Sequence, residues 1–208
     1  LRQSPSLMNK RFALGFSLVA LAGVLWGAMG VAAQHLMQGR GIGAFELVAA
    51  RQLASGALLV AVLALADRRS LMRVFASRAD ALGTAVCGLL MLGAHFGFFK
   101  AVAYSNAGTG AIFLTLIPLM GGAWLALRRG EPMRPVEILC FALSAAGVAL
   151  IMTGGDFTRL KFSPAAVAWG LWCAALSTAY AIYPVELVKR AGVAPVLGWS
   201  TLLGGLVG

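Results

Sequence analysis

Charged side chains are scarce in this 208-residue sequence, and acidic ones are the scarcest. Only 12% of the residues are Asp, Glu, Lys or Arg, and seven are acidic, whereas about a quarter of the residues of a soluble domain are charged. Hydrophobic residues make up 60% of the chain. This balance excludes an ordinary soluble domain and predicts a protein with the bilayer as its main solvent.

Cysteines and nucleotide-binding motifs are also few or missing. Cys87, Cys140 and Cys173 lie in three different apolar runs without the spacing of a metal site, so we expect neither a metal nor a disulfide framework. The sequence holds no G-x-x-x-x-G-K-[ST] motif, so ATP does not drive this chain directly. No cofactor is expected.

Long uncharged runs are what the sequence has instead. They cover residues 12–39, 101–127, 162–185 and 191–208. About 20 apolar residues cross the hydrocarbon of a bilayer as a helix, and the runs lack the alternation of barrel strands. The predicted fold is therefore an all-α integral membrane bundle.

The breaks between apolar runs predict six complete spans and part of a seventh. Charged or glycine-rich segments separate them, and the short segment 105–110, SNAGTG, is read as a turn. The predicted spans are 12–33, 44–66, 81–104, 107–127, 136–153, 165–185 and, still apolar at the last residue, 193–208.

Basic residues are distributed unevenly between alternate loops. With the N-terminus (1–11) inside, Arg40, Arg159 and Lys161 fall outside, with Lys100 near them. The inner side then holds twelve Lys and Arg residues: Arg2, Lys10, Arg11, Arg68, Arg69, Arg73, Arg78, Arg128, Arg129, Arg134, Lys189 and Arg190. The positive-inside rule predicts a multi-pass protein of the cell inner (plasma) membrane with a cytoplasmic N-terminus, and it explains the net charge of +10 without nucleic acid.

Two segments far apart in the sequence resemble each other. Residues 25–44 align with 171–194, so that Trp26 matches Trp172 and Gln34 matches Tyr180. The second copy lies five spans after the first, an odd offset, so the two copies cross in opposite directions. Inverted repeats are an architecture of secondary transporters.

Several motifs carry a resemblance to a known family. They are VLWGAMGVA (24–32), ELVAARQLASGALLV (46–60), AVAYSNAGTGAIFLTLIPLM (101–120), LRRGEPMRPVEILCFALSAAGVALI (127–151) and GWSTLLGGL (198–206). In this order they resemble the EamA family of the drug/metabolite transporter (DMT) superfamily. The resemblance implies ten helices in two inverted five-helix repeats around a central substrate path. It implies a first repeat at 12–157 and the start of a second at 158–208, with the remaining helices outside this sequence.

Polar residues inside the spans are the candidates for a substrate path. Trp26 and Gln34 share one face of the first span, and the repeat places Tyr180 at the position of Gln34. His95 lies midway along the third span, where an ionisable group more often faces a cavity than in a soluble core. For Tyr183 and, less well, Tyr180, an interfacial aromatic belt is the simpler explanation.

Arg51 is the most conspicuous of these candidates. It lies about 10 Å below the outer end of the second span, and Glu46 is turned about 140° away on the helix. A snorkelling anchor is the simpler explanation, but an arginine here belongs to the pattern of the EamA family. We expect it to point inward.

Backbone features complete the prediction. Pro118 should kink the fourth span, and the kink either serves as a gate or only shapes the bundle. Glycines four residues apart, at 23 and 27, 93 and 97, and 204 and 208, predict close helix packing.

The function predicted from these observations is secondary transport by alternating access. The protein is expected to export small metabolites, such as amino acids, or drug-like compounds, with the substrate and the lipid bilayer as its partners. The sequence is compatible with a homodimer but does not require one. The alternative is a membrane-embedded enzyme or an assembly subunit, but the spans offer few of the convergent acid and base groups that an enzyme requires.

Overall fold

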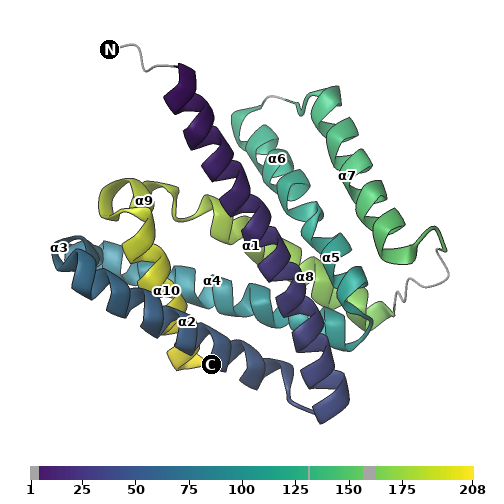
Figure 1. Ribbon diagram of the computed structural model, residues 1–208, viewed down its shortest axis with the longest axis horizontal. Coiled ribbons are helices and arrows are strands. Elements are labelled where there is room, and N and C mark those ends of the chain that lie inside the picture. The colour runs from purple at the N-terminus through teal and green to yellow at the C-terminus, as the bar shows by residue number, and fades with distance from the viewer. Residues whose placement is uncertain (1–4, 131, 157–162) are drawn as a thin grey trace.

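The protein is described by a computed structural model over residues 5–130, 132–156 and 163–208, and every regular element in these residues is a helix (Figure 1). The elements are α1 (Pro5–Arg40), α2 (Ala44–Ala66), α3 (Arg68–Leu71), the 3-10 helix η1 (Met72–Phe75), α4 (Arg78–Ala103), α5 (Ala107–Leu114), α6 (Leu116–Arg129), α7 (Pro135–Thr153), α8 (Pro164–Ile182), α9 (Val185–Ala191) and α10 (Val193–Val207).

Five stretches of the described chain are long and apolar enough to cross a membrane. They are Phe12–Arg40, Ala44–Ala66, Arg78–Ala103, Ala107–Arg128 and Pro164–Ile182. Two shorter apolar helices, Pro135–Leu150 and Val193–Val207, accompany them. A helical membrane protein is thereby confirmed, whereas the inverted repeat and the total of ten helices stay predictions.

The observed helix ends follow backbone chemistry more closely than hydropathy. α1 continues to Arg40, beyond the predicted end at residue 33, because helix-compatible polar residues follow the apolar run and the first residue with positive φ is Gly41. α8 ends at Ile182, before the predicted 185, since Pro184 cannot donate a backbone hydrogen bond to continue it.

The fourth predicted span is divided into two helices. α5 and α6 meet at Thr115, whose hydroxyl donates to the carbonyl of Ile112 over 2.6 Å. Pro118 explains this break, because its missing N–H and its ring both disfavour the helical bond to the carbonyl of Leu114. Whether the break acts as a gate is a separate prediction.

α4 is at the centre of the packed part of the structure. It contacts α2, α8 and α10, and α10 also packs along α2 (Figure 1). A Cβ placed on Gly56 of α2 would lie 2.4 Å from the backbone nitrogen of Leu202 in α10. This crossing therefore requires glycine.

The predicted glycine contacts are confirmed for two of the three pairs. Added Cβ atoms at Gly93 and Gly97 would meet side chains or backbone of α8 at 2.6–3.1 Å, and one at Gly204 would meet α2 and α4. For Gly23 and Gly27 the prediction is wrong within the described residues, because nothing lies within 4 Å of such a Cβ. The apolar surface of α1 around them is exposed.

Polar contacts join distant segments at the two ends of α4. At its start, Asp80 Oδ1 accepts hydrogen bonds from Arg190 Nη2 at 2.7 Å and Nε at 3.1 Å. At its other end, Ser163 Oγ donates to the carbonyl of Tyr104 over 3.2 Å. The segments that precede α4 and follow α8 thus lie at one end of the bundle, and the segments that follow α4 and precede α8 lie at the other.

Candidate functional site

A cavity of about 300 Å³ lies among the packed helices. Its wall is mainly apolar and aromatic, interrupted by a few polar side chains. The lining residues are Trp26, Met29, Arg51, Met91, Ala94, His95, Phe98, Phe99, Leu114, Ile117, Cys173, Ser177, Tyr180 and Leu197. The structure thus brings together four of the five predicted path residues.

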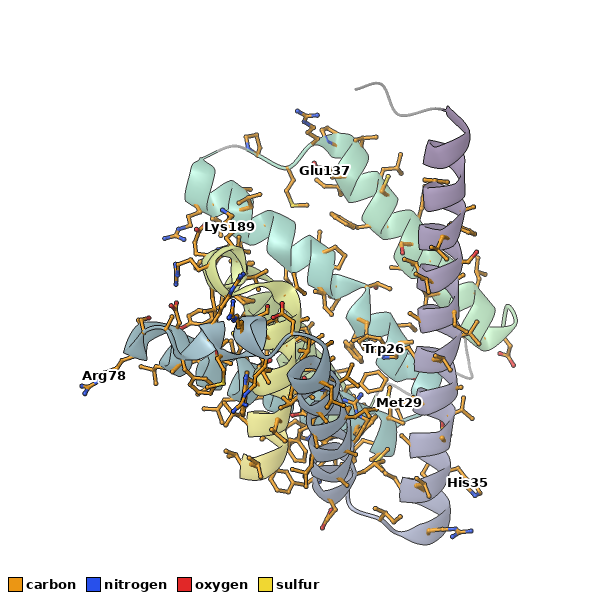
Figure 2. All side chains as sticks on the ribbon, turned by 60° about the vertical axis from the view of Figure 1, so that its left-hand side comes forward. Trp26, Met29, His35, Arg78, Glu137 and Lys189 are labelled. Atoms are coloured by element: carbon orange, nitrogen blue, oxygen red, sulfur yellow. The ribbon has the colours of Figure 1, made fainter. Side chains whose placement is uncertain are left out.

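α1 closes one side of the cavity with two side chains. Trp26 and Met29 point from α1 toward the other helices, whereas His35 points away (Figure 2). Their separation of three residues places them on one face of the helix. Trp26 is still 53% exposed, so α1 forms the outer wall.

Arg51 brings the positive charge to the cavity. It lies on α2, and its Cζ is 5.7 Å from the centroid of the Phe99 ring of α4, within the range of a cation–π contact. Its Nε and Nη2 atoms are buried and have no hydrogen-bond partner among the described residues. The side chain therefore offers unused donors at the cavity, as expected of an inward-pointing arginine.

His95 is held by Gln52, a residue that no sequence pattern marks as part of the site. Gln52 Nε2 lies 3.0 Å from His95 Nδ1. With the amide in this orientation its nitrogen donates and Nδ1 accepts. Gln52 thereby ties α2 to α4 through His95.

Gln52 itself is tightly enclosed. It is 1% exposed, and a Cβ on Gly204 of α10 would lie 2.3 Å from Gln52 Oε1. The amide thus fills the space that glycine leaves on α10 while it bonds to α4. The only feature of the sequence that points to Gln52 is its polarity beside Arg51 in an apolar span. This feature does not indicate that its partner is His95.

The opposite wall of the cavity comes from α8. Tyr180 and Ser177 contribute hydroxyl groups, and Cys173 Sγ lies 3.8 Å from Ser177 Oγ. Cys173 is buried and free. These groups make the α8 wall partly polar.

Gln34 does not line this cavity. Its Oε1 accepts a hydrogen bond from the backbone N–H of Ala107 over 2.9 Å, at the start of α5, and its Nε2 donates to Gln38 over 3.2 Å. Gln34 lies eight residues beyond Trp26, about 12 Å along the helix. Helical spacing gives the face on which a residue lies but not its depth along the bundle, and Gln34 lies past the cavity.

Pro118 also lies outside the lining, although its neighbour Ile117 belongs to it. The proline acts on the wall indirectly, through the break at Thr115. No group of three or more His, Cys, Asp or Glu residues that could hold a metal ion occurs in the parts of the chain that the structure describes.

The described lining therefore combines one guanidinium, one imidazole and two hydroxyl-bearing side chains with aromatic walls, and none of its residues is acidic. Apolar walls with a few convergent polar groups are the usual make-up of a small-molecule site, and 300 Å³ is at the lower end of their size range. This arrangement suits binding of a small solute.

The chain is similar to known transporters. The profile of the EamA-like transporter family matches residues 13–153. The chain is 31% identical over 194 residues to the "Uncharacterized inner membrane transporter YicL" of Salmonella typhimurium (strain LT2), and the match covers 93% of this chain and 64% of that protein. No solved structure matches. The family match covers more than half of the chain and includes α1, α2 and α4 with their cavity residues, and the protein therefore belongs to the EamA-like transporter family.

Proposed function

We propose that the full-length protein is a secondary transporter that moves a small solute across the inner membrane through the cavity. The observation that carries this proposal is the meeting of Trp26, Arg51, His95 and Tyr180 around one cavity between apolar helices. Family membership and the likeness to a protein named as an inner membrane transporter support it.

Alternating access is the mechanism that we propose. The cavity is bounded by α1, α2, α4, α5 and α6 within the family match and by α8 and α10 beyond it, so relative movement of these two groups would open it toward either side. Movement of one half of a bundle against the other around a fixed site is how transporters with repeats work. Export of metabolites or drug-like compounds, with a cytoplasmic N-terminus, is the direction and orientation proposed from the sequence.

The alternative function is a membrane-embedded enzyme or an assembly subunit. Acid–base catalysis needs groups that take up and release protons at a reacting atom. His95 is the one imidazole of the described lining, and its Nδ1 is occupied by Gln52. The cavity is therefore better suited to binding than to chemistry.

A cavity-filling substitution tests transport directly. In the full-length protein, Ser177→Phe places a bulky side chain in the cavity, and Ser55→Phe makes the same change at an exposed position of α2. Both variants and the wild type are reconstituted in proteoliposomes and tested with a panel of small solutes. We expect wild type and Ser55→Phe to move at least one solute faster than protein-free liposomes, and Ser177→Phe to lose that flux; unchanged flux in Ser177→Phe would refute a path through this cavity.

A further inference from the structure

Arg51 is a cation without a counter-ion in the described structure. Its Nε and Nη2 atoms are buried without hydrogen-bond partners, and none of the described cavity-lining residues is acidic. Burying an unpaired charge is costly, and inside a membrane such groups are usually paired or functional. The contact with Phe99 stabilises the charge but leaves those two nitrogens without a hydrogen bond.

The chemistry of the missing partner follows from the guanidinium. Its donors form a planar fork that matches the two oxygens of a carboxylate. One buried positive charge balances one negative charge, so a singly charged anion fits better than a doubly charged phosphate ester, which would leave a charge uncompensated. Among common anions, a carboxylate therefore fits Arg51 best in both charge and geometry.

The rest of the cavity defines the other end of the ligand. Trp26, Met29, Met91 and Phe98 present aromatic and thioether surface. Such a wall favours an apolar or aromatic body, because burying apolar surface against it is favourable.

From this geometry we infer that the transported solute is a small monocarboxylate with an apolar body, bound with its carboxylate on Arg51. This inference rests on the proposed function. It adds a substrate class and makes Arg51 the residue that selects for charge.

Three compounds with the same body separate charge from shape: 3-phenylpropanoate, 3-phenylpropanamide and 3-phenylpropylamine. Their dissociation constants for the full-length protein in detergent are measured by titration calorimetry. We expect the carboxylate to bind about tenfold or more tightly than the amide, the difference of a charge-assisted hydrogen-bonded pair, and the amine to bind more weakly than both. Equal binding of the three compounds, or no binding of the carboxylate, overturns the inference. A partner for Arg51 in another part of the protein would also produce this loss of selective binding.

Arg51→Gln and Arg40→Gln give the matched variants. Arg40 is exposed at the end of α1 and lies outside the cavity. We expect Arg51→Gln to weaken the carboxylate about tenfold or more while amide binding is retained, which also shows that the variant is folded, and Arg51→Lys to be intermediate. Equal loss in Arg40→Gln, or unchanged selectivity in Arg51→Gln, contradicts a charge-selecting Arg51.

Flux in proteoliposomes separates this inference from the proposed function. Selective binding of the carboxylate without flux of any compound supports the ligand class and refutes transport. Flux of the amide as fast as that of the carboxylate, unaffected by Arg51→Gln, supports transport and refutes the ligand class.

Discussion

Gln52 Nε2 on α2 lies 3.0 Å from His95 Nδ1 on α4, and this contact holds the His95 side chain that lines the cavity. Gln52 is almost fully buried, and its amide also packs against Gly204 of α10. One amide thus links three helices that are distant in the sequence. Gln52 thus supports the cavity from behind its wall without lining it.

Gln52→Leu keeps a side chain of similar size but removes the amide. His95 Nδ1 then loses its donor, so we expect the free energy of unfolding to fall by about 1–3 kcal/mol, the cost of a buried polar atom without a partner. Unfolding is followed in detergent by circular dichroism. Gln38→Leu, at an exposed position of α1, is the control, and equal stability of both variants would show that the contact contributes nothing.

Gly56→Ala tests the crossing of α2 and α10. The new Cβ would lie 2.4 Å from the backbone nitrogen of Leu202, so the helices must separate. Overpacking of this kind costs about 1–3 kcal/mol. Titration with denaturing detergent measures it, and Gly23→Ala on α1, where nothing lies within 4 Å, should change stability little; equal effects of the two substitutions would contradict the close crossing.

The ion pair of Asp80 and Arg190 joins the start of α4 to α9. The Asp80 side chain is 10% exposed and that of Arg190 is 59% exposed. Leaving Asp80 without its partner should therefore cost more stability than leaving Arg190 without its partner. We expect Asp80→Asn and Arg190→Gln each to lower the Tm. The double variant should have a Tm no lower than that of the less stable single variant, because the same interaction is lost in all three. Additive losses in Tm would show that the pair is not coupled.

Most of the fold could be predicted from the sequence, because apolar runs and their breaks report membrane helices directly. α2 was predicted to the residue, and Trp26, Arg51, His95 and Tyr180 were predicted to line a common path. Each of these residues is polar or aromatic within an apolar helix, which is a signal that needs no tertiary information.

The remaining features depend on the register between helices. Gln52 meets His95 across 43 residues and Asp80 meets Arg190 across 110, and no pattern within one helix reveals such partners. Gln34 was placed on the path because spacing gives the face of a helix but not its depth relative to neighbours.

The proposed orientation is tested with two arginines at exposed positions. Arg69 precedes α4 and Arg40 ends α1, at opposite ends of the bundle in the proposed topology. Thr158, in the predicted outer loop 154–164, would be another labelling position on the outer side. It lies outside the described residues, so Arg40 is the better choice. In a background without Cys87, Cys140 and Cys173, an impermeant thiol reagent added to whole cells should label Arg40→Cys and spare Arg69→Cys. The opposite labelling would invert the topology.

Transport by Arg51 variants of the full-length protein tests the central claim most directly. Flux of a solute that the wild type moves is measured in proteoliposomes holding equal amounts of inserted protein. Arg51 is the cation of the described cavity lining, and two of its nitrogens have no hydrogen-bond partner among the described residues. The account therefore predicts that Arg51→Ala inserts normally and loses most of the flux, while Arg51→Lys keeps part of it. Flux at the wild-type rate in Arg51→Ala would contradict the account and make Arg51 an anchor at the membrane surface.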